Sequence, residues 1–391
     1  MNNLSSTHKL GVKASPIEEA EFEYCHLTLN DLNYHYVMTK RCKDSILCLF
    51  LHGFPETWYS WKRMLNFFRT STEFTSLAID LVGVGSTDAP RDLNRYSFES
   101  VSLDLELLIQ HLGFDSVVIV GHNWGNHVGF HLARTRPNLV RAMISISSGY
   151  FPEPTHPKSL IEKFPVLGYQ LNLAKEENCR QFDENLEVFI DSFWCYKYPS
   201  ALESCLAVQP HENFIDFVNA IPEKKYVSPD DEIKNYTLSQ FKKTGTWGAT
   251  NWYRTFEINR QFASSISNDL VLHLPVLLIS GEDDFSVSKI TAGTEYLKNF
   301  VVQVGLSVPH LFNFKVYPHS WSLCSCKSRR RNRLQYIRLA QCQLEVEQLT
   351  HFQLCILISA LLISTPLVYP TLPSIAIYIR YTPKIGIKQA I

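Results

Sequence analysis

The residues best placed to do chemistry are in the pentapeptide Gly-His-Asn-Trp-Gly at positions 121–125. The apolar run 117–120 precedes it and a helical pattern follows it, which predicts a sharp turn between a buried strand and a helix. Such a turn projects its central side chain from the sheet and often carries a nucleophile. The central residue here is Asn123, whose neutral carboxamide is a poor nucleophile. This position therefore decides whether the chain can carry out a first covalent step.

A second motif, His-Gly-Phe-Pro-Glu at 52–56, follows an apolar run at 46–51 that is typical of a strand buried on both faces. The backbone amide of Phe54 is expected to face the same point as the backbone amide of Trp124. Two such amides form an oxyanion hole, which stabilises negative charge that develops on an oxygen. We expect His52, at the start of the motif, to line the substrate pocket.

Candidates for an acid and a base follow later strands, in the chain order nucleophile, acid, base. In Gly-Glu-Asp-Asp at 281–284, Asp284 is the preferred carboxylate for orienting a histidine, and Asp283 is the alternative. His319 follows an apolar run that could be the last strand, and it is the preferred base. His310 is the alternative base, and the lack of any functional base is a third interpretation.

The elements that must position these residues alternate between short β-rich runs and longer amphipathic stretches, which predicts a mostly parallel sheet covered by helices. This pattern stops near Ser147 and resumes near Leu274, an interruption too long for a simple loop. Its aromatic residues include Trp247, Trp252 and Phe256. We interpret it as an inserted helical cap over the carboxyl edge of the sheet, where α/β proteins bind ligands. Strands are expected at 25–39 (as a hairpin), 46–51, 77–79, 117–120, 143–146 and 276–279, and helices at 97–112, 124–135, 182–195 and 231–243.

Composition limits the partners and the compartment. Of the 391 residues, 45% are hydrophobic and 19% are charged, as in ordinary globular proteins. A net charge of −1 gives no field that attracts nucleic acid, so no nucleic-acid partner is expected. The ten cysteines form no Cys-x-x-Cys pair, which favours reduced thiols. Segment 1–22 has no apolar signal region, so we expect a cytoplasmic protein without a secretory signal. No metal-ligand cluster or nucleotide-binding glycine loop appears, so no cofactor is implied.

After about Trp321 the sequence changes character. A basic run at 327–333 is followed by a strongly apolar segment that ends at Pro366. Counted over residues 352–379, the apolar stretch reaches the length of a membrane span, but it then contains three prolines. Membrane contact through this segment is the alternative to a cytoplasmic location. A buried segment and an aberrant tail are the other two interpretations.

Taken together, the motifs at 52–56 and 121–125 and the aromatic cap segments resemble the soluble epoxide hydrolases of the α/β-hydrolase superfamily. The resemblance covers roughly residues 20–321 and implies the α/β-hydrolase fold, a mostly parallel central sheet flanked by helices with an inserted helical cap. It divides the chain into core at 20–147, helical cap at 148–270, core at 271–321 and a divergent tail at 322–391.

In that family an elbow aspartate attacks an epoxide carbon to form an alkyl-enzyme ester, which a His–Asp pair then hydrolyses to a vicinal diol. Two cap tyrosines donate hydrogen bonds to the epoxide oxygen, and Tyr169 and Tyr253 stand in segments that look like those bearing them. Their neighbours Gln170 and Trp252 are expected to line the pocket. The resemblance implies a small apolar substrate or ligand, either an aryl or a lipid-like epoxide.

The sequence departs from the family pattern at several positions. Asn123 replaces the aspartate, Asn126 replaces a small residue and predicts looser packing of the helix on its strand, and Val82 replaces an arginine. Two functions follow as hypotheses. One is an impaired epoxide hydrolase, active weakly or after its own site hydrolyses Asn123 to aspartate. The other is a non-catalytic protein that binds an apolar ligand under the cap. Serine esterase activity is disfavoured because no Gly-x-Ser-x-Gly stands at the elbow.

Overall fold

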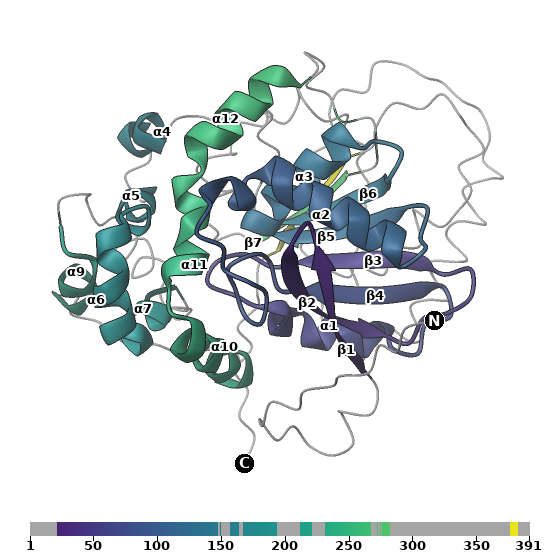
Figure 1. The fold of residues 1–391 in the computed structure, drawn as a ribbon, viewed down its shortest axis with the longest axis horizontal. Helices are drawn as coiled ribbons and strands as arrows, with labels where there is room; N and C mark the ends of the chain where they lie inside the picture. Colours follow the sequence, from purple (N-terminus) through teal and green to yellow (C-terminus); the bar gives the residue numbers. More distant parts are fainter. Residues whose placement is uncertain are drawn as a thin grey trace.

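The computed structural model describes residues 22–147, 149, 157–163, 167–193, 212–220, 231–266, 272, 274, 276–281 and 376–381. Within these ranges, eight strands form a single sheet in the order β1-β2-β4-β3-β5-β6-β7-β8 (Figure 1). The strands are β1 (Phe22–Leu29), β2 (Leu32–Thr39), β3 (Ile46–Leu51), β4 (Phe74–Ile79), β5 (Val117–His122), β6 (Val140–Ile146), β7 (Val276–Gly281) and β8 (Ala376–Tyr381).

The sheet is mostly parallel, as predicted. Strands β1 and β2 form an antiparallel hairpin, and β2 also pairs antiparallel with β4. The remaining neighbours, from β4 through β3, β5, β6 and β7 to β8, are parallel. Each predicted strand lies on an observed strand, because the apolar runs mark segments that are covered on both sides.

Helices cover both faces of the sheet. Alternate residues of β3 explain why its sequence is wholly apolar: Leu47 and Leu49 pack with one core cluster, and Phe50 packs with another. The first cluster includes α2 (Phe98–His111) and α3 (Trp124–Thr135). The second includes the 3₁₀ helix η1 (Trp58–Trp61) and α1 (Lys62–Phe68). The predicted helices 97–112 and 124–135 are thus confirmed. A further 3₁₀ helix, η2, spans Leu93–Tyr96.

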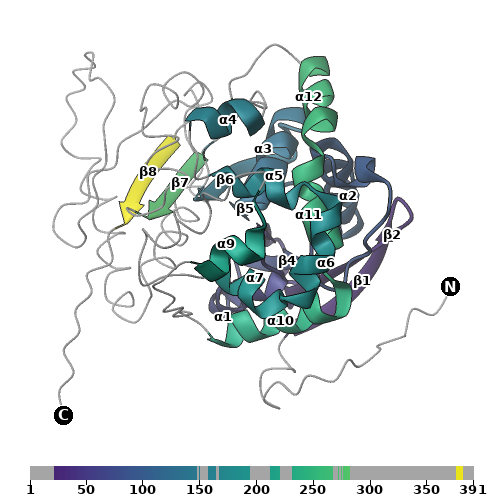
Figure 2. The same cartoon turned by 90° about the vertical axis from the view of Figure 1, so that its left-hand side faces the viewer.

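Further helices lie between β6 and β7 in the sequence and gather beside the sheet (Figures 1 and 2). We call them the cap helices: α4 (Pro157–Lys163), α5 (Tyr169–Leu173), η4 (Glu176–Asn178), α6 (Cys179–Glu184), α7 (Leu186–Phe193), α9 (Phe214–Ala220), α10 (Asp231–Thr244), α11 (Trp247–Thr250), η5 (Asn251–Arg254) and α12 (Phe256–Ser265). They form a third cluster rich in phenylalanine. The domain boundaries at 148 and 270 stay a prediction. The helix predicted at 182–195 is interrupted at Asn185, which separates α6 from α7.

Residues 376–381 form β8, which pairs parallel with β7 at the edge of the sheet (Figure 2). This strand lies within residues 322–391, whose interpretation as a divergent tail stays a prediction. The segment reads Ala-Ile-Tyr-Ile-Arg-Tyr, whose β-branched and aromatic residues favour a strand. The same strand takes up the end of the apolar stretch 352–379. Among the described residues, no helix has the length and apolar character that crossing a membrane requires.

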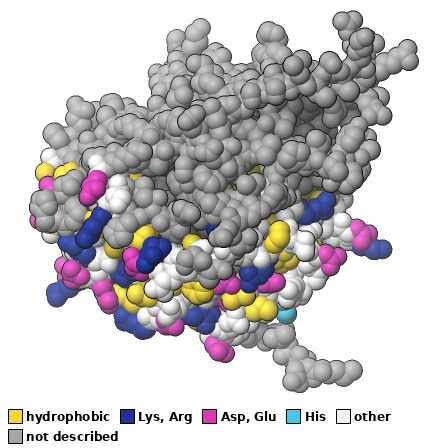
Figure 3. All heavy atoms as spheres, turned by 90° about the horizontal axis from the view of Figure 1, so that it is seen from above, with side chains coloured by type: hydrophobic (Ala, Val, Ile, Leu, Met, Phe, Trp, Pro, Cys, Tyr) yellow, Lys and Arg dark blue, Asp and Glu magenta, His cyan; other side chains and the backbone are white. Residues whose placement is uncertain are grey.

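The outer surface carries both signs of charge. On the face in Figure 3, the coloured part shows Lys and Arg interspersed with Asp and Glu, with small hydrophobic areas between them. This mixture agrees with the net charge of −1.

Candidate active site

The predicted sharp turn is present between β5 and α3. Strand β5 ends at His122, α3 begins at Trp124, and Asn123 between them has φ 49° and ψ −117°. A positive φ is costly for a residue with a Cβ, by on the order of 1–3 kcal/mol. The turn therefore keeps Asn123 in a strained conformation at the carboxyl edge of the sheet.

Two glycines near Asn123, Gly125 in the same turn and Gly53 in the turn after β3, let these backbone segments approach each other closely. A Cβ on Gly125 would lie 2.3 Å from the carbonyl oxygen of Leu51, and a Cβ on Gly53 would lie 2.4 Å from the Cβ of Asn123. The sequence predicted that Asn126 would loosen the packing of the helix, but the structure shows Asn126 closely packed. Its side chain is fully buried and its Nδ2 donates a hydrogen bond to the carbonyl oxygen of Ile146 at 2.6 Å.

The backbone amide of Phe54 donates a hydrogen bond to Oδ1 of Asn123 at 3.1 Å. The first predicted oxyanion amide therefore faces the elbow side chain. Trp124 is the first residue of α3, and the backbone N–H groups of a first helical turn have no acceptor within the helix. The two motifs found in the sequence thus meet at Asn123.

The two predicted cap tyrosines come together over this turn. Tyr169 begins α5 and Tyr253 lies on η5, and their ring centroids are 6.1 Å apart. The ring of Tyr253 packs edge-on against Phe54 at 5.3 Å and against Trp124 at 5.0 Å. Both tyrosines are buried. Burial and then the neighbouring Tyr169 raise the pKa of Tyr253 well above its usual value, so its phenol stays neutral and can donate a hydrogen bond.

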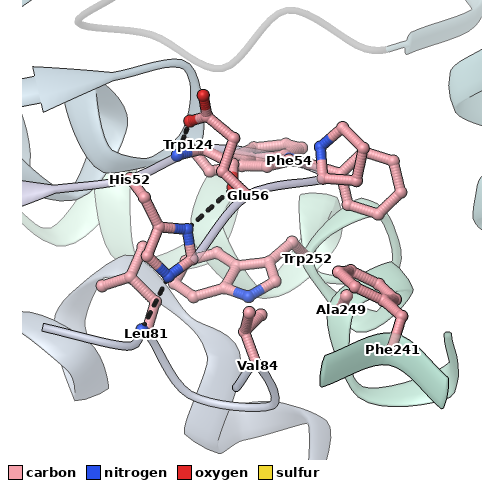
Figure 4. Close-up of a pocket in the computed structure, with 11 residues that line it drawn as sticks. His52, Phe54, Glu56, Leu81, Val84, Trp124, Phe241, Ala249 and Trp252 are labelled. Atoms are coloured by element: carbon pink, nitrogen blue, oxygen red, sulfur yellow. Dashed lines mark hydrogen bonds between the residues drawn. The ribbon is translucent and has the colours of Figure 1, made fainter. Parts of the chain in front are cut away.

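A small cavity lies next to the turn (Figure 4). Phe54 and Trp124 line one part of it, and Trp252 lines another. Trp252 is buried, and its Nε1 donates a hydrogen bond to the carbonyl oxygen of Val82 at 3.1 Å. Gln170, predicted to line the pocket, is half-buried on α5 beside Tyr169. The other lining residues are His52, Gly53, Pro55, Glu56, Leu81, Val84, Phe241 and Ala249.

His52 lines this cavity as predicted, but both of its ring nitrogens form hydrogen bonds with the backbone. Its Nδ1 donates to the carbonyl oxygen of Gly53 at 2.8 Å, and its Nε2 accepts from the backbone N–H of Leu81 at 3.0 Å (Figure 4). Burial lowers the pKa of His52, which favours the neutral ring that this pair of bonds requires. His52 therefore holds two loops together and has no ring nitrogen left for a substrate.

A family model described as alpha/beta hydrolase fold matches residues 47–305. The chain belongs to the α/β-hydrolase fold family. It resembles epoxide hydrolases within that family. It is 30% identical to Bifunctional epoxide hydrolase 2 of Sus scrofa over 61% of this chain and 42% of the relative. It is 28% identical to Epoxide hydrolase 3 of Siraitia grosvenorii over 64% of this chain and 78% of the relative. The chain thus spans less than half the length of the bifunctional relative.

Solved epoxide hydrolase structures share the fold of this α/β-hydrolase. One from an endophytic Streptomyces superposes with a TM-score of 0.63 at 20% identity, covering 72% of this chain and 88% of that one. One from Vigna radiata superposes with a TM-score of 0.57 at 24% identity, covering 72% of this chain and 88% of that one. At these identities the likeness concerns the fold alone.

The predicted acid and base of this α/β-hydrolase lie outside the described residues. This holds for Asp284 and its alternative Asp283, and for His319 and its alternative His310. Their roles stay predictions. Within the described residues, no group of three His, Cys, Asp or Glu side chains could hold a metal ion.

One pair of polar residues at the site was missed in the sequence. Oε2 of Glu56 accepts a hydrogen bond from Nδ1 of His122 at 2.7 Å and another from the backbone N–H of Gly53 at 2.9 Å. Burial alone would raise the pKa of Glu56, but the charge and hydrogen bond of His122 and the Gly53 amide outweigh it and lower this pKa to about 2. The pair ties the turn at 52–56 to the elbow. An acidic residue in one motif and a histidine in the other were the only sequence signals for it.

Proposed function

We propose that this α/β-hydrolase is an epoxide-hydrolase-like enzyme that converts an apolar aryl or lipid-like epoxide to a vicinal diol, with a first step that Asn123 impairs. The observation that best supports this proposal is the position of Tyr253. Its ring packs on both Phe54 and Trp124, next to the elbow residue, and Tyr169 lies beside it. Two phenols over an elbow suit the opening of an epoxide ring, because the departing oxygen needs a proton donor.

With a carboxylate at position 123, the reaction would proceed in two steps. A carboxylate oxygen attacks an epoxide carbon, the ring C–O bond breaks, and the released oxygen takes a proton from a phenol of Tyr169 or Tyr253. Water, deprotonated by His319 with Asp284 as its partner, then attacks the carbonyl carbon of the ester. The C–O bond between this carbonyl and the substrate breaks, and the departing oxygen takes the proton of the new carboxyl group, which becomes the carboxylate again. The proton on His319 returns to the phenolate, and the diol leaves with the net addition of one water molecule.

Asn123 limits the first step because an amide oxygen lacks negative charge. Loss of a nucleophile typically lowers the rate by about 10³-fold or more. Hydrolysis of the Asn123 amide to a carboxylate, with release of ammonia, would restore the nucleophile. The same water, base and oxyanion amides that the ester step needs could supply this conversion.

A second candidate function is the binding of an apolar ligand without turnover. It is favoured by the hydrogen bond from the Phe54 amide to Oδ1 of Asn123, which occupies the oxygen that would have to attack. The aromatic surroundings of the elbow, from Phe54 and Trp124 to Trp252, suit an apolar ligand in either case.

A turnover experiment on two proteins separates these functions. Diol formation from styrene oxide and from a fatty-acid epoxide is measured for the protein as purified and for Asn123→Asp. Intact mass and peptide mass spectrometry of the unsubstituted protein, before and after long incubation, detect conversion of Asn123. Asn235→Asp, which adds the same charge at an exposed position of α10, is the matched control.

Each outcome has one meaning. Activity of the purified protein, or activity that rises as Asn123 is converted, supports the impaired enzyme. Activity in Asn123→Asp alone, with Asn123 unchanged by mass in the parent, supports the binding function. A folded Asn123→Asp protein that forms no diol from either epoxide overturns the assignment of the site.

We also propose a cytoplasmic location. The described cysteines Cys25, Cys42, Cys48 and Cys179 are free, which agrees with the reduced thiols expected from the sequence. Cell fractionation tests this location against the alternative, membrane contact through residues 352–379, which would bring the chain down with the membrane fraction.

A further inference from the structure

The residue that precedes Tyr253 is hydrogen-bonded to the core. Trp252 and Tyr253 are consecutive on η5, a single 3₁₀ turn of four residues. Nε1 of Trp252 donates a hydrogen bond of 3.1 Å to the carbonyl oxygen of Val82, in the loop after β4. The Trp252 side chain is buried, and loss of a buried bond leaves its partner unsatisfied. This bond therefore fixes η5, and with it Tyr253, relative to the sheet.

A close backbone contact lies next to this bond. Gly248 is on α11, which leads directly into η5, and Gly83 follows Val82. A Cβ on Gly248 would be 2.4 Å from the carbonyl oxygen of Gly83, and a Cβ on Gly83 would be 2.7 Å from the carbonyl oxygen of Gly248. Only two glycines allow backbones to approach so closely. The segment that carries Tyr253 is thus held on the loop after β4 at two points.

The loop after β4 is in turn bonded to the turn that carries the oxyanion amide. The backbone N–H of Leu81 donates to Nε2 of His52 at 3.0 Å, and Nδ1 of His52 donates to the carbonyl oxygen of Gly53 at 2.8 Å (Figure 4). Gly53 precedes Phe54, whose amide bonds to Asn123. Hydrogen bonds and peptide units therefore connect the elbow, through the loop after β4, to η5.

We propose that Trp252 is a positioning residue, whose bond to the Val82 carbonyl sets the place of the Tyr253 phenol over the elbow. The proposal rests on the proposed function, in which Tyr253 is a proton donor for ring opening. The ring of Tyr253 packs on Phe54 and on Trp124, so a shift of the short turn η5 displaces the phenol directly. The bond uses a backbone carbonyl, and the replacement of an arginine by Val82 therefore leaves the acceptor in place.

Two matched substitutions test this role in the full chain. Trp252→Phe keeps an aromatic ring and removes the N–H that bonds to Val82. Trp247→Phe is the control, because it makes the same change five positions earlier in the sequence. The bond lost in the control runs from Nε1 of Trp247 to Oε1 of Glu176 at 3.0 Å, and it is exposed. Both variants lose one indole hydrogen bond, but only the first loses a bond to the core loop.

The first measurement needs no substrate. Tetranitromethane nitrates tyrosines that reach their phenolate form, and peptide mass spectrometry reads the rate at each tyrosine. Burial raises the pKa of both Tyr253 and Tyr34 well above the usual value, and Tyr34 in the sheet is the internal reference. We expect nitration of Tyr253 to be at least about fivefold faster in Trp252→Phe, because one buried hydrogen bond is lost. Tyr34 in that variant, and both tyrosines in Trp247→Phe, should react as in the parent.

The second measurement is turnover in the Asn123→Asp background. We expect Trp252→Phe to lower kcat for diol formation by at least about tenfold, with a smaller change in KM, because a displaced donor costs more than weaker binding. Once Tyr253→Phe has removed the hydroxyl, Trp252→Phe should lower kcat no further. If Trp252 only supported the packing of the cap, its substitution would lower kcat in both backgrounds.

The proposal is overturned if Tyr253 in folded Trp252→Phe is nitrated at the parent's rate, or if Tyr34 becomes faster by the same factor. Should Trp252→Phe fail to fold, the parent decides under low urea. There, nitration of Tyr253 should rise together with hydrogen exchange of the Trp252 indole N–H, read by NMR of protein with ¹⁵N-labelled tryptophan. Nitration of Tyr253 that rises while this N–H stays protected overturns the proposal.

Failure of the proposed function is a separate result. If Asn123→Asp forms no diol, the assignment of the reaction fails. The nitration rates involve no epoxide and still decide whether Trp252 sets the place of Tyr253.

Discussion

Phe54 and Asn123 are joined by a 3.1 Å hydrogen bond between the backbone amide of the first and Oδ1 of the second, although 69 positions separate them in the sequence. The bond connects the turn after β3 to the turn after β5, which are neighbours in the sheet. In a hydrolase with a charged nucleophile, such an amide would stabilise a carboxylate oxygen. Here it fixes the orientation of a neutral amide.

The strain at Asn123 can be measured with two substitutions. Both Asn123→Gly and Asn123→Ala remove the hydrogen bond to Phe54, but only glycine adopts φ 49° without steric cost. We expect Asn123→Gly to be more stable than Asn123→Ala by about 1 kcal/mol, after allowance for the greater freedom of glycine in the unfolded chain. Urea denaturation measures the difference. Equal stability of the two variants would mean that the turn is not strained.

The close packing of α3 on the sheet can be tested by comparing substitutions at two of its glycines, Gly125 and Gly129. A Cβ on Gly125 would meet the backbone carbonyl of Leu51 at 2.3 Å, whereas a Cβ on Gly129 would first meet the terminal methyl of Met143 at 2.8 Å. The backbone at Leu51 cannot move away from an added Cβ as easily as the end of the flexible Met143 side chain can. We expect Gly125→Ala to destabilise the fold by about 2–3 kcal/mol and Gly129→Ala by about 1 kcal/mol or less. Thermal unfolding of both variants checks the order, and the reverse order would contradict it.

The sequence predicted the elbow because every part of it is local. An apolar run, two small residues and a helical pattern around Asn123 determine the turn without reference to the rest of the chain. The tyrosine pair was different, since no periodicity links Tyr169 to Tyr253, and only the family resemblance suggested that they meet. Strand β8 was not predicted although its residues favour a strand, because its pairing with β7 joins segments that are far apart along the chain.

The contact of Glu56 with His122 was missed for a related physical reason. Ion pairs between loops depend on how two turns approach each other, and neither hydrophobic periodicity nor spacing encodes that approach. His52 lines the small cavity, as the pocket motif predicted, but its ring has no nitrogen left for a ligand. Its two ring nitrogens instead bond to the backbone of Gly53 and Leu81.

The Glu56–His122 pair makes the stability dependent on pH. The pKa of Glu56 is lowered from 4.5 to about 2 in the folded protein. Its stabilisation is therefore fully present above about pH 4.5 and is lost as the pH falls towards about 2. The side chains are 18% and 28% exposed, and we expect Glu56→Gln to cost about 2 kcal/mol near neutral pH.

Urea denaturation between about pH 7 and about pH 3 tests this pH dependence. The difference in unfolding free energy between the parent and Glu56→Gln should shrink steadily over the acidic part of this range. Glu257→Gln is a suitable control, because Glu257 pairs with Arg260 where both side chains are more than half exposed, and its effect should be small at every pH. If the difference in unfolding free energy between the parent and Glu56→Gln stays constant with pH, the Glu56–His122 pair is not the source of the pH dependence.

The contacts that hold α10 to the core can be tested by their response to salt. Nζ of Lys62, on α1, lies 2.8 Å from Oε1 of Glu232 on α10, and Nε1 of Trp58 donates to the hydroxyl of Tyr236 at 3.0 Å. The ring of Tyr236 also stacks on Tyr59 with a centroid distance of 4.0 Å. Charge and aromatic contacts thus hold the same helix to the core, and the two kinds of contact should respond differently to salt.

Glu232 is 61% exposed whereas Lys62 is 11% exposed, so solvent screens the ion pair. A double-mutant cycle with Lys62→Met and Glu232→Gln should give a coupling free energy of about 0.5–1 kcal/mol that falls as salt is added. Tyr236→Phe keeps the stacking and loses the hydrogen bond from Trp58, and we expect a loss of about 1 kcal/mol that salt does not change. A salt-independent coupling in the cycle, or a salt-dependent loss in Tyr236→Phe, would show that these contacts do not act on α10 as their geometry predicts.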